Sequence, residues 1–334
     1  MTTPEWTIPA VLQLSGGYWS ACALHAGVAL GLFAPLADER LDAAGVAAAC
    51  SADPRATAML LDALTALGLV AKRDDIYEAT PFSARYLASS SPDYLGHIIF
   101  HHHHLMGGWA RLHEAVAAGK PLRERVSHGD DRRERESFLM GMYNLASQLA
   151  PQVAAGLDLS GCSRLLDMGG GPGTYAVHFC LRNPQLTAVV YDLPTTREFA
   201  EGVISRHGVQ ERVSFVSGDF HADGVPGGFD AAWLSHILHS DGPQGCAVIL
   251  GKGVSALRPG GMLYVQEFIL DDDKSGPLFP ALFSLNMLQG TPAGQAYSGA
   301  EIRAMMEQAG LTDVRRLDAP LPNGAGIMAG RLPG

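Results

Sequence analysis

Cysteine is scarce in this chain, and no two cysteines are close together. The 334 residues contain five of them, at Cys22, Cys50, Cys162, Cys180 and Cys246, and none forms a CxxC pair. A disulfide framework would need regular, short spacings, so we expect reduced thiols that are mostly buried. This pattern is typical of a cytoplasmic protein.

A surplus of basic residues is also missing. Lys and Arg total 24 against 34 Asp and Glu, which gives a net charge of −10. Binding to a nucleic-acid backbone requires clustered positive charge, so we expect no nucleic-acid partner. Charged residues make up only 17% of the chain and hydrophobic residues 47%. That composition indicates a packed globular protein, long enough for two domains.

Charged residues of either sign are absent from Trp6 to Ala37. The stretch is long enough to cross a membrane, but it contains Gln13, Ser20 and His25 and no basic residue precedes it. The basic region of a signal peptide is missing for the same reason. We therefore expect no membrane span, and interpret the stretch as an apolar helical segment buried against a partner chain.

The N-terminal part has the pattern of a winged helix. Apolar spacing predicts helices over 10–37, 41–50 and 54–67, two short strands around the turn Arg73–Asp75, and more helix over 95–120. Winged helices often bind DNA, but residues 38–90 carry more acids than bases, and phosphate would repel them. We expect this part to make protein contacts instead.

Strands and helices alternate in the rest of the chain. We predict strands over 163–168, 187–191, 212–217, 229–235 and 261–270, and near 312–317 and 325–330. Helices are predicted over 137–157, 172–182, 195–207, 243–257 and 299–309. This alternation indicates an α/β fold with a mostly parallel sheet, which binds its ligands at the carboxyl ends of the strands.

The run LLDMGGGPG at residues 165–173 marks a ligand site. An apolar strand ends near Asp167 and breaks into a glycine turn that opens a helix, and the next apolar run ends in Asp192. Glycines let a ligand approach the backbone closely, and an acid at the next strand end can bind a ribose. The pattern therefore predicts a ligand that carries a nucleoside.

The glycine turn alone leaves two nucleosides open. Residues 171–176 loosely satisfy GxGxxA, which a nicotinamide cofactor would need, and a lone match of that kind is weak. Asp167 directly before the glycines would repel a pyrophosphate but not an aminoalkyl sulfonium. Asp219 and Phe220 end the third strand, where an acid can accept from an adenine amine and a ring can pack on its face. These residues favour S-adenosylmethionine.

Several motifs of the chain, taken together, resemble those of a known family. The motifs LLDMGGGPG, VVYDLP, SFVSGDF, LSHILHSD, LRPGG and LYVQEFIL are similar to those of two-domain small-molecule O-methyltransferases of the caffeate and acetylserotonin type, over residues 10–330. The resemblance implies a class I methyltransferase, Rossmann-like catalytic domain over 121–334. It also implies a winged-helix dimerisation and substrate-lid domain over 1–120, and therefore a homodimer.

The resemblance also implies particular site residues. The cofactor would be bound by Asp167, Gly169, Gly171, Gly173, Asp192, Leu193, Asp219, Phe220 and Ser235, with Asp192 at the ribose. His239 matches the family's general base, and Glu267 matches the acid that orients it. The chemistry fits, because an alcohol or phenol is a poor nucleophile until it loses its proton, and an imidazole with a pKa near ~6.5 can take that proton. A carboxylate on the far ring nitrogen would set the tautomer.

The match to the family is incomplete around this base. The family usually has an acid directly after the histidine, where this chain has Ser240, with Asp241 one place later. A later family glutamate falls on Ala296, and the following position, often Arg, is Tyr297. The base is present but part of its support is missing. This leaves open methyl transfer to carbon, sulfur or nitrogen, with His239 only orienting the acceptor, and more remotely a nicotinamide oxidoreductase.

Two further groups of residues concern the acceptor. The resemblance implies a pocket for a small aromatic molecule, walled by Trp109, Phe138, Met142, His236, Phe283 and Met287. Histidines also crowd residues 97–113, and their helical spacing can bind a metal. We interpret them instead as polar residues of a channel or a helix face, and expect no metal.

Overall fold

The computed structural model describes residues 6–123 and 131–334. The chain divides into two compact units, Met1–Leu105 and Met106–Gly334. The domain boundary near residue 120 stays a prediction. Within the described residues no helix is both long and apolar enough to cross a membrane.

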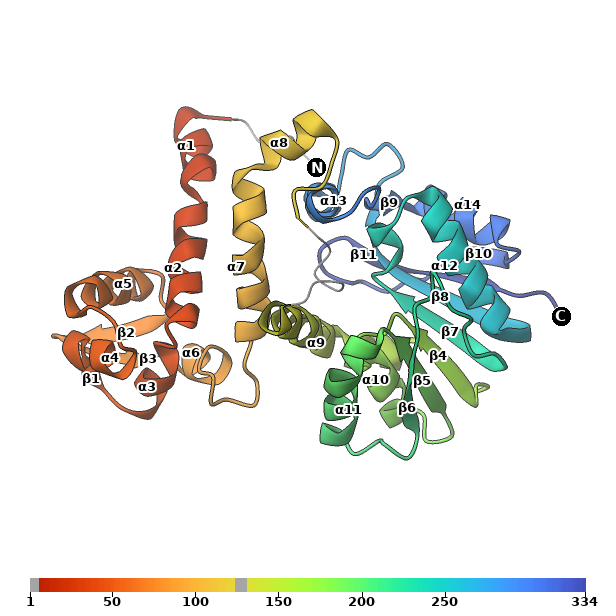
Figure 1. The fold of residues 1–334 in the computed structure, drawn as a ribbon, viewed down its shortest axis with the longest axis horizontal. Coiled ribbons are helices and arrows are strands. Elements are labelled where there is room, and N and C mark those ends of the chain that lie inside the picture. Colours follow the sequence, from red (N-terminus) through yellow and green to blue (C-terminus); the bar gives the residue numbers. More distant parts are fainter. Residues whose placement is uncertain (1–5, 124–130) are drawn as a thin grey trace. The chain divides into compact units, whose positions relative to one another are not determined.

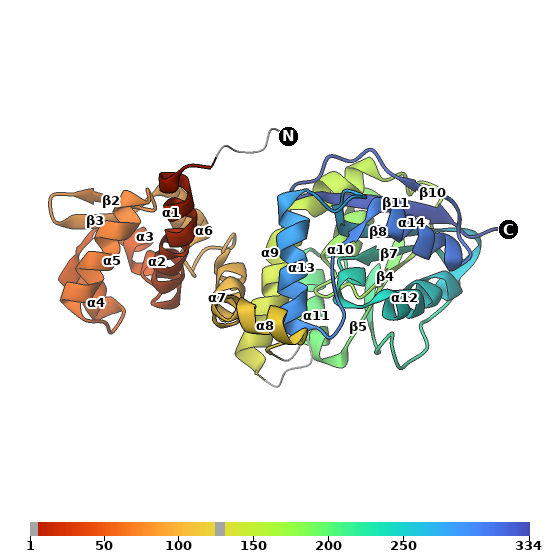
Figure 2. The same cartoon turned by 90° about the horizontal axis from the view of Figure 1, so that it is seen from above.

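The described part of the first unit, from residue 6 onward, contains six short helices and a small sheet, followed by most of α7. Its elements are α1 (Ile8–Gly16), α2 (Tyr18–Ala29), α3 (Phe33–Asp38), β1 (Leu41–Asp42), α4 (Ala43–Ala49), α5 (Pro54–Ala66), β2 (Val70–Arg73), β3 (Ile76–Ala79), α6 (Pro81–Tyr86) and α7 (Gly96–Ala110). The strands pair antiparallel in the order β1-β3-β2. Helices α4 and α5 with the hairpin β2–β3 form the predicted winged helix (Figure 2).

Local signals explain where these helices begin. Asp42 accepts a hydrogen bond from the Gly45 amide at 2.7 Å, and Asp53 accepts one from the Ala56 amide at 2.8 Å. Each aspartate thereby satisfies an amide that has no partner inside its helix. The predicted single helix over 10–37 is three helices in the structure. Its second break follows from Gly31, whose φ of +69° ends α2.

Helices α1 and α2 present a large apolar surface. Within one chain α1 has no buried residue, and Leu14 and Trp19 are each 69% exposed. Isolated exposed apolar side chains are ordinary, but a continuous patch of this kind marks an interaction surface.

The second unit is an α/β domain. Its elements are α8 (Leu112–Ala118), α9 (Arg132–Gly156), β4 (Arg164–Met168), α10 (Thr174–Arg182), β5 (Thr187–Asp192), η2 (Pro194–Thr196), α11 (Arg197–Arg206), β6 (Val213–Ser217), β7 (Phe229–Ser235), η3 (Leu238–Ser240), α12 (Pro243–Ala256), β8 (Leu257–Leu270), α13 (Leu278–Gly290), β9 (Tyr297–Ser298), α14 (Gly299–Gln308), β10 (Thr312–Arg316) and β11 (Ala325–Arg331). In this unit the predicted elements did not include helix α13, strand β9 or the short η3, and in the first unit they did not include α6. The sequence of α13 is apolar on all sides of the helix, so it shows no helical periodicity.

The sheet runs β10-β11-β8-β7-β4-β5-β6, with β9 beside β8. Strands β6, β5, β4, β7 and β8 are parallel, and β11 and β10 are antiparallel. The chain leaves β4 toward β5 on one side and returns to β7 on the other. This is a topological switch point, where α/β sheets bind their ligands. The α/β prediction is therefore confirmed.

The central strands are buried on both faces, which explains their continuous apolar sequence. Successive residues of β7 face opposite sides of the sheet and pack into separate cores. Trp233 packs with α9, α10 and α11, and Leu234 packs with α12 and α14. Figure 1 shows these two groups of helices on opposite sides of the sheet. Trp233 is fully buried, with its ring centroid 5.2 Å from that of Tyr175 and 5.1 Å from that of Phe179.

Replacing Trp233 should therefore destabilise the fold strongly. We expect Trp233→Ala to lower the free energy of unfolding by about 3–5 kcal/mol, because it removes a large buried ring and leaves a cavity. Urea denaturation followed by circular dichroism measures this. Val248→Ala, at a position that is 43% exposed, serves as the control and should change stability by about 0.5 kcal/mol or less. Equal effects of the two changes would contradict this account of the core.

Candidate active site

The glycine turn after β4 requires glycine for reasons visible in its backbone. Gly169, Gly171 and Gly173 have φ values of +67°, +53° and +74°, which side chains rarely adopt. A Cβ atom at Gly169 would lie 2.8 Å from the Ile237 side chain, and one at Gly173 would lie 2.9 Å from Val190. A Cβ at Gly171 would meet nothing within 4 Å. The turn is thus tightly packed against neighbouring side chains at Gly169 and Gly173, and it has open space at Gly171.

Asp167 is the penultimate residue of β4, just before this turn, and is almost completely buried. It is 1% exposed, and its Oδ2 accepts a hydrogen bond from the Ala176 amide at 3.2 Å. Its Oδ1 has no hydrogen-bond partner among the described residues. Burial raises the pKa of Asp167 to about 7, against the lowering effect of the Ala176 amide. The carboxyl group therefore has room for one more donor, and a cation would favour its charged form.

Asp192 joins the end of β5 to the glycine turn. Its Oδ2 accepts from the Gly171 amide at 2.7 Å, and its Oδ1 accepts from the Leu193 amide at 2.7 Å and the Thr196 hydroxyl at 3.0 Å. Burial raises the pKa of Asp192, although these hydrogen bonds act to lower it. Two carboxyl groups thus flank the turn. They fit a ligand with an ammonium or sulfonium group and disfavour a pyrophosphate.

The loop after β6 reaches the same turn. Asp219 Oδ1 accepts from the His221 amide at 2.8 Å, so the acid also shapes its own loop. The ring of Phe220 comes within 3.4 Å of the Cβ position of Gly169. The structure therefore brings the predicted cofactor residues Asp167, Asp192 and Phe220 to one end of the sheet.

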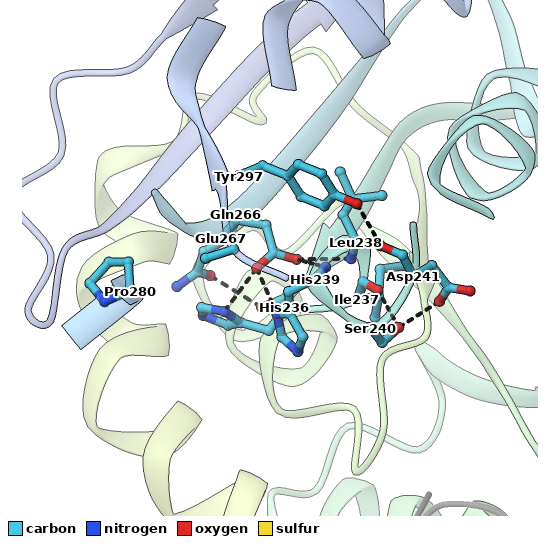
Figure 3. Close-up of polar contacts among 12 residues, drawn as sticks. His236, Ile237, Leu238, His239, Ser240, Asp241, Gln266, Glu267, Pro280 and Tyr297 are labelled. Atoms are coloured by element: carbon cyan, nitrogen blue, oxygen red, sulfur yellow. Dashed lines mark hydrogen bonds and ion pairs between the residues drawn. The ribbon is translucent and has the colours of Figure 1, made fainter. Parts of the chain in front are cut away.

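His239 and Glu267 are in direct contact (Figure 3). His239 Nδ1 lies 2.8 Å from Glu267 Oε2, and the Glu267 Oε1 atom accepts from the Leu238 amide at 2.8 Å and the His239 amide at 3.2 Å. Burial acts to raise the pKa of Glu267, but attraction by His239 and His236 outweighs it and holds that pKa below its ordinary value. An ionised, buried carboxylate therefore fixes both the backbone and the ring of His239.

His236 approaches the same carboxylate. Its Nδ1 atom lies 3.6 Å from Glu267 Oε2, which is longer than a hydrogen bond, so the interaction is electrostatic. His236 has a φ of +56°, uncommon for a residue with a side chain. It offers, with His239 and Glu267, ligand atoms within 4.8 Å of one another, and among the described residues no other such group was found. The histidines of α7 form no cluster of that kind within residues 6–123.

Aromatic rings surround the two histidines. The Phe283 ring centroid lies 4.7 Å from that of His239, and the Phe268 centroid lies 4.3 Å from that of His236. Phe279 joins them, 4.8 Å from Phe268. Phe268 was missed in the sequence, although it directly follows Glu267. The structure thus brings together His236, His239 and Phe283 of the predicted site.

Other predicted residues are less closely joined to this centre. Ser235 Oγ lies 3.3 Å from Gln266 Oε1, behind the histidines at the end of β7. Trp109, Phe138, Met142 and Met287 are half-buried residues of α7, α9 and α13. Their part in an acceptor pocket stays a prediction.

The missing family acids are replaced by a different set of contacts. Ala296 is 2% exposed, too deeply buried and too short to support His239. The Tyr297 hydroxyl donates to the Asp241 carbonyl at 2.6 Å, and the Ser240 hydroxyl lies 2.6 Å from the Ile237 carbonyl and 2.7 Å from Asp241 Oδ2. The loop that carries His239 is therefore held by hydroxyl groups of Ser240 and Tyr297 as well as by the buried carboxylate of Glu267.

Comparison with known proteins agrees with this geometry. Residues 12–89 match the O-methyltransferase dimerisation domain family and residues 109–312 match the O-methyltransferase domain family. The chain is 37% identical to 3-hydroxy-5-methyl-1-naphthoate 3-O-methyltransferase of Streptomyces sahachiroi, over 98% of this chain and 97% of that protein. It is 31% identical to the N,N-dimethyltransferase OxyT of Streptomyces rimosus, over 90% of each.

A solved structure shows the same architecture. Human N-acetylserotonin methyltransferase in complex with S-adenosylmethionine matches with a TM-score of 0.86 and 27% identity, over 100% of both chains. The predicted family, fold and cofactor are thereby confirmed. The O-methyltransferase domain family covers most of the catalytic unit, and the buried carboxyl groups at the glycine turn suit a cationic cofactor. The chain therefore belongs to the S-adenosylmethionine-dependent O-methyltransferases, and it contains their dimerisation domain.

Proposed function

We propose that this enzyme methylates a hydroxyl group of a small aromatic acceptor and that His239 is the general base. The observation that carries the proposal is the 2.8 Å contact between His239 Nδ1 and Glu267 Oε2. A carboxylate facing Nδ1 keeps the proton on that nitrogen, which leaves the lone pair on Nε2. His239 can therefore accept a proton from the acceptor.

Besides a base, methyl transfer to a hydroxyl group requires a methyl donor and an acceptor held in line with it. S-adenosylmethionine supplies an electrophilic methyl group bound to a positively charged sulfur. The acceptor oxygen passes its proton to Nε2 of His239 while it forms the new bond to the methyl carbon, and the carbon–sulfur bond breaks. Glu267 stabilises the imidazolium that results, because it is buried and ionised. Holding acceptor and cofactor in line supplies much of the remaining acceleration.

We assign the cofactor to the end of the sheet at the glycine turn. Asp167 receives the ammonium group, and Gly169, Gly171 and Gly173 allow close approach to the backbone. The ribose binds at Asp192, beside Leu193. The adenine would be held by Asp219 and Phe220, and Ser235 would contact the cofactor from the end of β7. Support comes from the unpartnered Oδ1 atom of Asp167 and the open space in front of Gly171.

The acceptor would bind on the aromatic side of His239. Phe268, Phe279 and Phe283 are mutually packed rings next to it, and flat rings stack well on such a surface. Trp109, Phe138, Met142, His236 and Met287 complete the proposed pocket. Such a lining has few charges, so it suits an aromatic molecule and does not suit a nucleic acid.

A second candidate is methyl transfer to nitrogen, carbon or sulfur on the same fold. The absence of an acid at Ser240 and Ala296 favours it, because an acceptor that is already nucleophilic needs a weaker base. OxyT, an N,N-dimethyltransferase, is one of the relatives. In this case His239 would orient the acceptor without removing a proton.

Replacing the base distinguishes these two functions. We expect His239→Ala to lower kcat for a phenolic acceptor by about 10²–10⁴-fold, the usual contribution of general-base catalysis. Methyl transfer from radiolabelled S-adenosylmethionine to a panel of naphthols, hydroxynaphthoates and aryl amines measures it. Calorimetric affinity for S-adenosylhomocysteine should stay the same, which controls for folding. Full turnover of phenols by His239→Ala would rule out the base assignment.

The raised pKa of Asp167 predicts how cofactor binding depends on pH. In the ligand-free enzyme this carboxyl group is protonated below a pKa of about 7. A bound ammonium group favours the charged form, so affinity for S-adenosylhomocysteine should rise about tenfold per pH unit from pH 5.5 to 7 and then level off. Conversely, without ligand the stability that the neutral carboxyl contributes is lost as the pH rises from 3.8 to about 7.

Calorimetry with S-adenosylhomocysteine between pH 5.5 and 8.5 measures this dependence. Asp167→Asn keeps an oxygen for the Ala176 amide but has no charge to titrate. Its affinity should be weaker and nearly flat over the same range. A flat profile for the unaltered enzyme would show that Asp167 does not meet the ammonium group.

We also propose that two copies of the chain associate through the dimerisation domain. The apolar surface on α1 and α2 would then be covered by the partner. Trp19→Glu should convert dimers into monomers, because burying an unpaired carboxylate is costly. Light scattering after size exclusion measures the mass. Arg55→Glu, an exposed change on α5, is the charge-altering control and should remain dimeric, whereas a monomeric unaltered protein would contradict the proposal.

A further inference from the structure

A positively charged side chain lies at the C-terminal end of α13, and the proposed mechanism does not use it. The amides of Leu122 and Arg123 both donate to the Gln289 carbonyl, at 2.9 and 3.2 Å. These hydrogen bonds fix the segment after α8 to the last turn of α13, and Figures 1 and 2 both show α8 beside α13. The backbone of Arg123 is therefore held by the helix that carries Phe283.

The guanidinium group of Arg123 covers Gly290. A Cβ atom built on Gly290 would lie 3.0 Å from Arg123 Nη2, 3.1 Å from Cζ and 3.5 Å from Nε. The flat group thus lies where the side chain of any other residue at position 290 would begin. Such a side chain would compete with the guanidinium for this space.

Gly290 belongs to the face of α13 that is directed toward His239. Residues three, four and seven apart share one face of an α-helix, so the Cβ directions of Phe283, Met287 and Gly290 agree. The Phe283 ring centroid is 4.7 Å from that of His239. With a rise of about 1.5 Å per residue, Gly290 lies about 10 Å further along this face. The guanidinium is therefore on the same side of α13 as the imidazole, displaced toward the C-terminal end of the helix.

The segment after α13 returns to the loop of His239. A Cβ atom on Gly294 would lie 2.5 Å from the His239 carbonyl oxygen and 2.5 Å from Thr291 Oγ1. Those two oxygens are therefore no more than 5 Å apart, because each lies 2.5 Å from the same point. Thr291 directly follows Gly290. The end of α13 that the guanidinium covers thus borders the proposed active site.

Arg123 has no carboxylate in contact with it. Burial lowers the pKa of Arg123, and attraction by Glu134 acts in the opposite direction without a hydrogen bond. In the part of the chain that the structure describes, the Arg123 side chain forms neither a hydrogen bond nor an ion pair. Glu134 is four residues before Phe138 on α9, so the two share a face of that helix. The charge therefore lies near the predicted pocket residue Phe138 and still has its donors to offer.

The chemistry of a guanidinium favours one class of anion. Its planar set of N–H donors matches the two oxygens of a carboxylate, and the group remains charged at any pH at which an enzyme acts. An aromatic acceptor next to the His239 ring would reach Arg123 only with a group at its far end. That group would have to be an anion to compensate the half-buried charge.

We propose that Arg123 binds a carboxylate of the acceptor, so that the preferred acceptors are aromatic hydroxy acids with the two groups at opposite ends of the ring system. This assignment depends on the proposed function of the site. The hydroxyl group meets Nε2 of His239 and is methylated, while the carboxylate accepts two hydrogen bonds from the guanidinium. The ring system lies between them along α13. The distance of about 10 Å from Phe283 to Gly290 along the helix sets the separation of the two groups.

Four acceptors test this assignment without a change in the protein: 6-hydroxy-2-naphthoate, its methyl ester, 2-naphthol, and 3-hydroxy-2-naphthoate, whose carboxylate is next to the hydroxyl. A hydrogen bond between charged groups is worth about a 10- to 100-fold change in affinity. In calorimetry with the S-adenosylhomocysteine complex, we expect 6-hydroxy-2-naphthoate to bind more tightly than the other three by this factor. The values of kcat/KM should follow the same order. Equal binding of the acid and its methyl ester would contradict the role of Arg123.

Variants of Arg123 locate the effect. Arg123→Met keeps an apolar stem over Gly290 and removes the charge, so the affinity ratio of 6-hydroxy-2-naphthoate to its methyl ester should fall to about one. Arg123→Lys keeps the charge without the planar pair of donors and should retain part of the preference. Arg133→Met removes an exposed arginine of α9 and should keep the ratio of the unaltered enzyme. Thermal unfolding midpoints verify that each variant is folded.

Binding of the cofactor product alone gives an independent readout, because S-adenosylhomocysteine also has a carboxylate. Its affinity should be the same for Arg123→Met and for the unaltered enzyme. A tenfold loss would place Arg123 at the amino-acid end of the cofactor and would overturn its role with the acceptor.

Methylation of all four acceptors without a preference for the acid would overturn the role of Arg123 and leave the proposed function intact. A preference in binding that depends on Arg123, with no methylation of any hydroxyl, would support the role of Arg123 and overturn O-methylation.

Discussion

The carboxylate of Glu267 is the centre on which the proposed site depends. It lies at the end of β8, yet it accepts hydrogen bonds from two amides and from an imidazole of the loop that follows β7. Buried charges are stable only when they are paired and hydrogen-bonded. Glu267 meets this condition through its neighbours, so the loop conformation and the ionisation of the carboxylate maintain each other. A neutral residue there would release the loop and the histidine together.

The end of the sheet where we propose that the cofactor binds follows a different principle. Asp167 and Asp192 are carboxyl groups whose burial raises their pKa values, so without a ligand they are less well compensated than Glu267. Gly169, Gly171 and Gly173 adopt positive φ values that would strain other residues, and they add the conformational entropy that glycine loses on folding. Free energy that would otherwise stabilise the empty protein is thus available to a cationic ligand. One half of the site is prearranged, and the other is completed by what it binds.

Sequence patterns predicted the second unit more completely than the first. Buried parallel strands such as β4 and β7 are uniformly apolar and end in glycine or polar residues, so their positions and the switch point were evident. The single helix predicted over 10–37 was divided, because apolar composition without charge carries no information about where a helix breaks. Helix α13 was missed for a similar reason, since its sequence is apolar on all sides. In the site, His239 and Glu267 were found by family motif. The left-handed backbone of His236 and its approach to Glu267 have no local sequence signal.

The pairing of β11 with β8 has a consequence for how the protein is made. Gly326 of β11 lies directly opposite Glu267 in this antiparallel pair, and β7 lies on the other side of β8. The strand that carries the carboxylate is therefore fixed on both edges only after α13, β9, α14 and β10 have been synthesised. A ribosome-bound chain can form the winged helix early, because its contacts are local. It cannot enclose Glu267 until β11 has emerged, so the contact between His239 and Glu267 is among the last features that a nascent chain acquires.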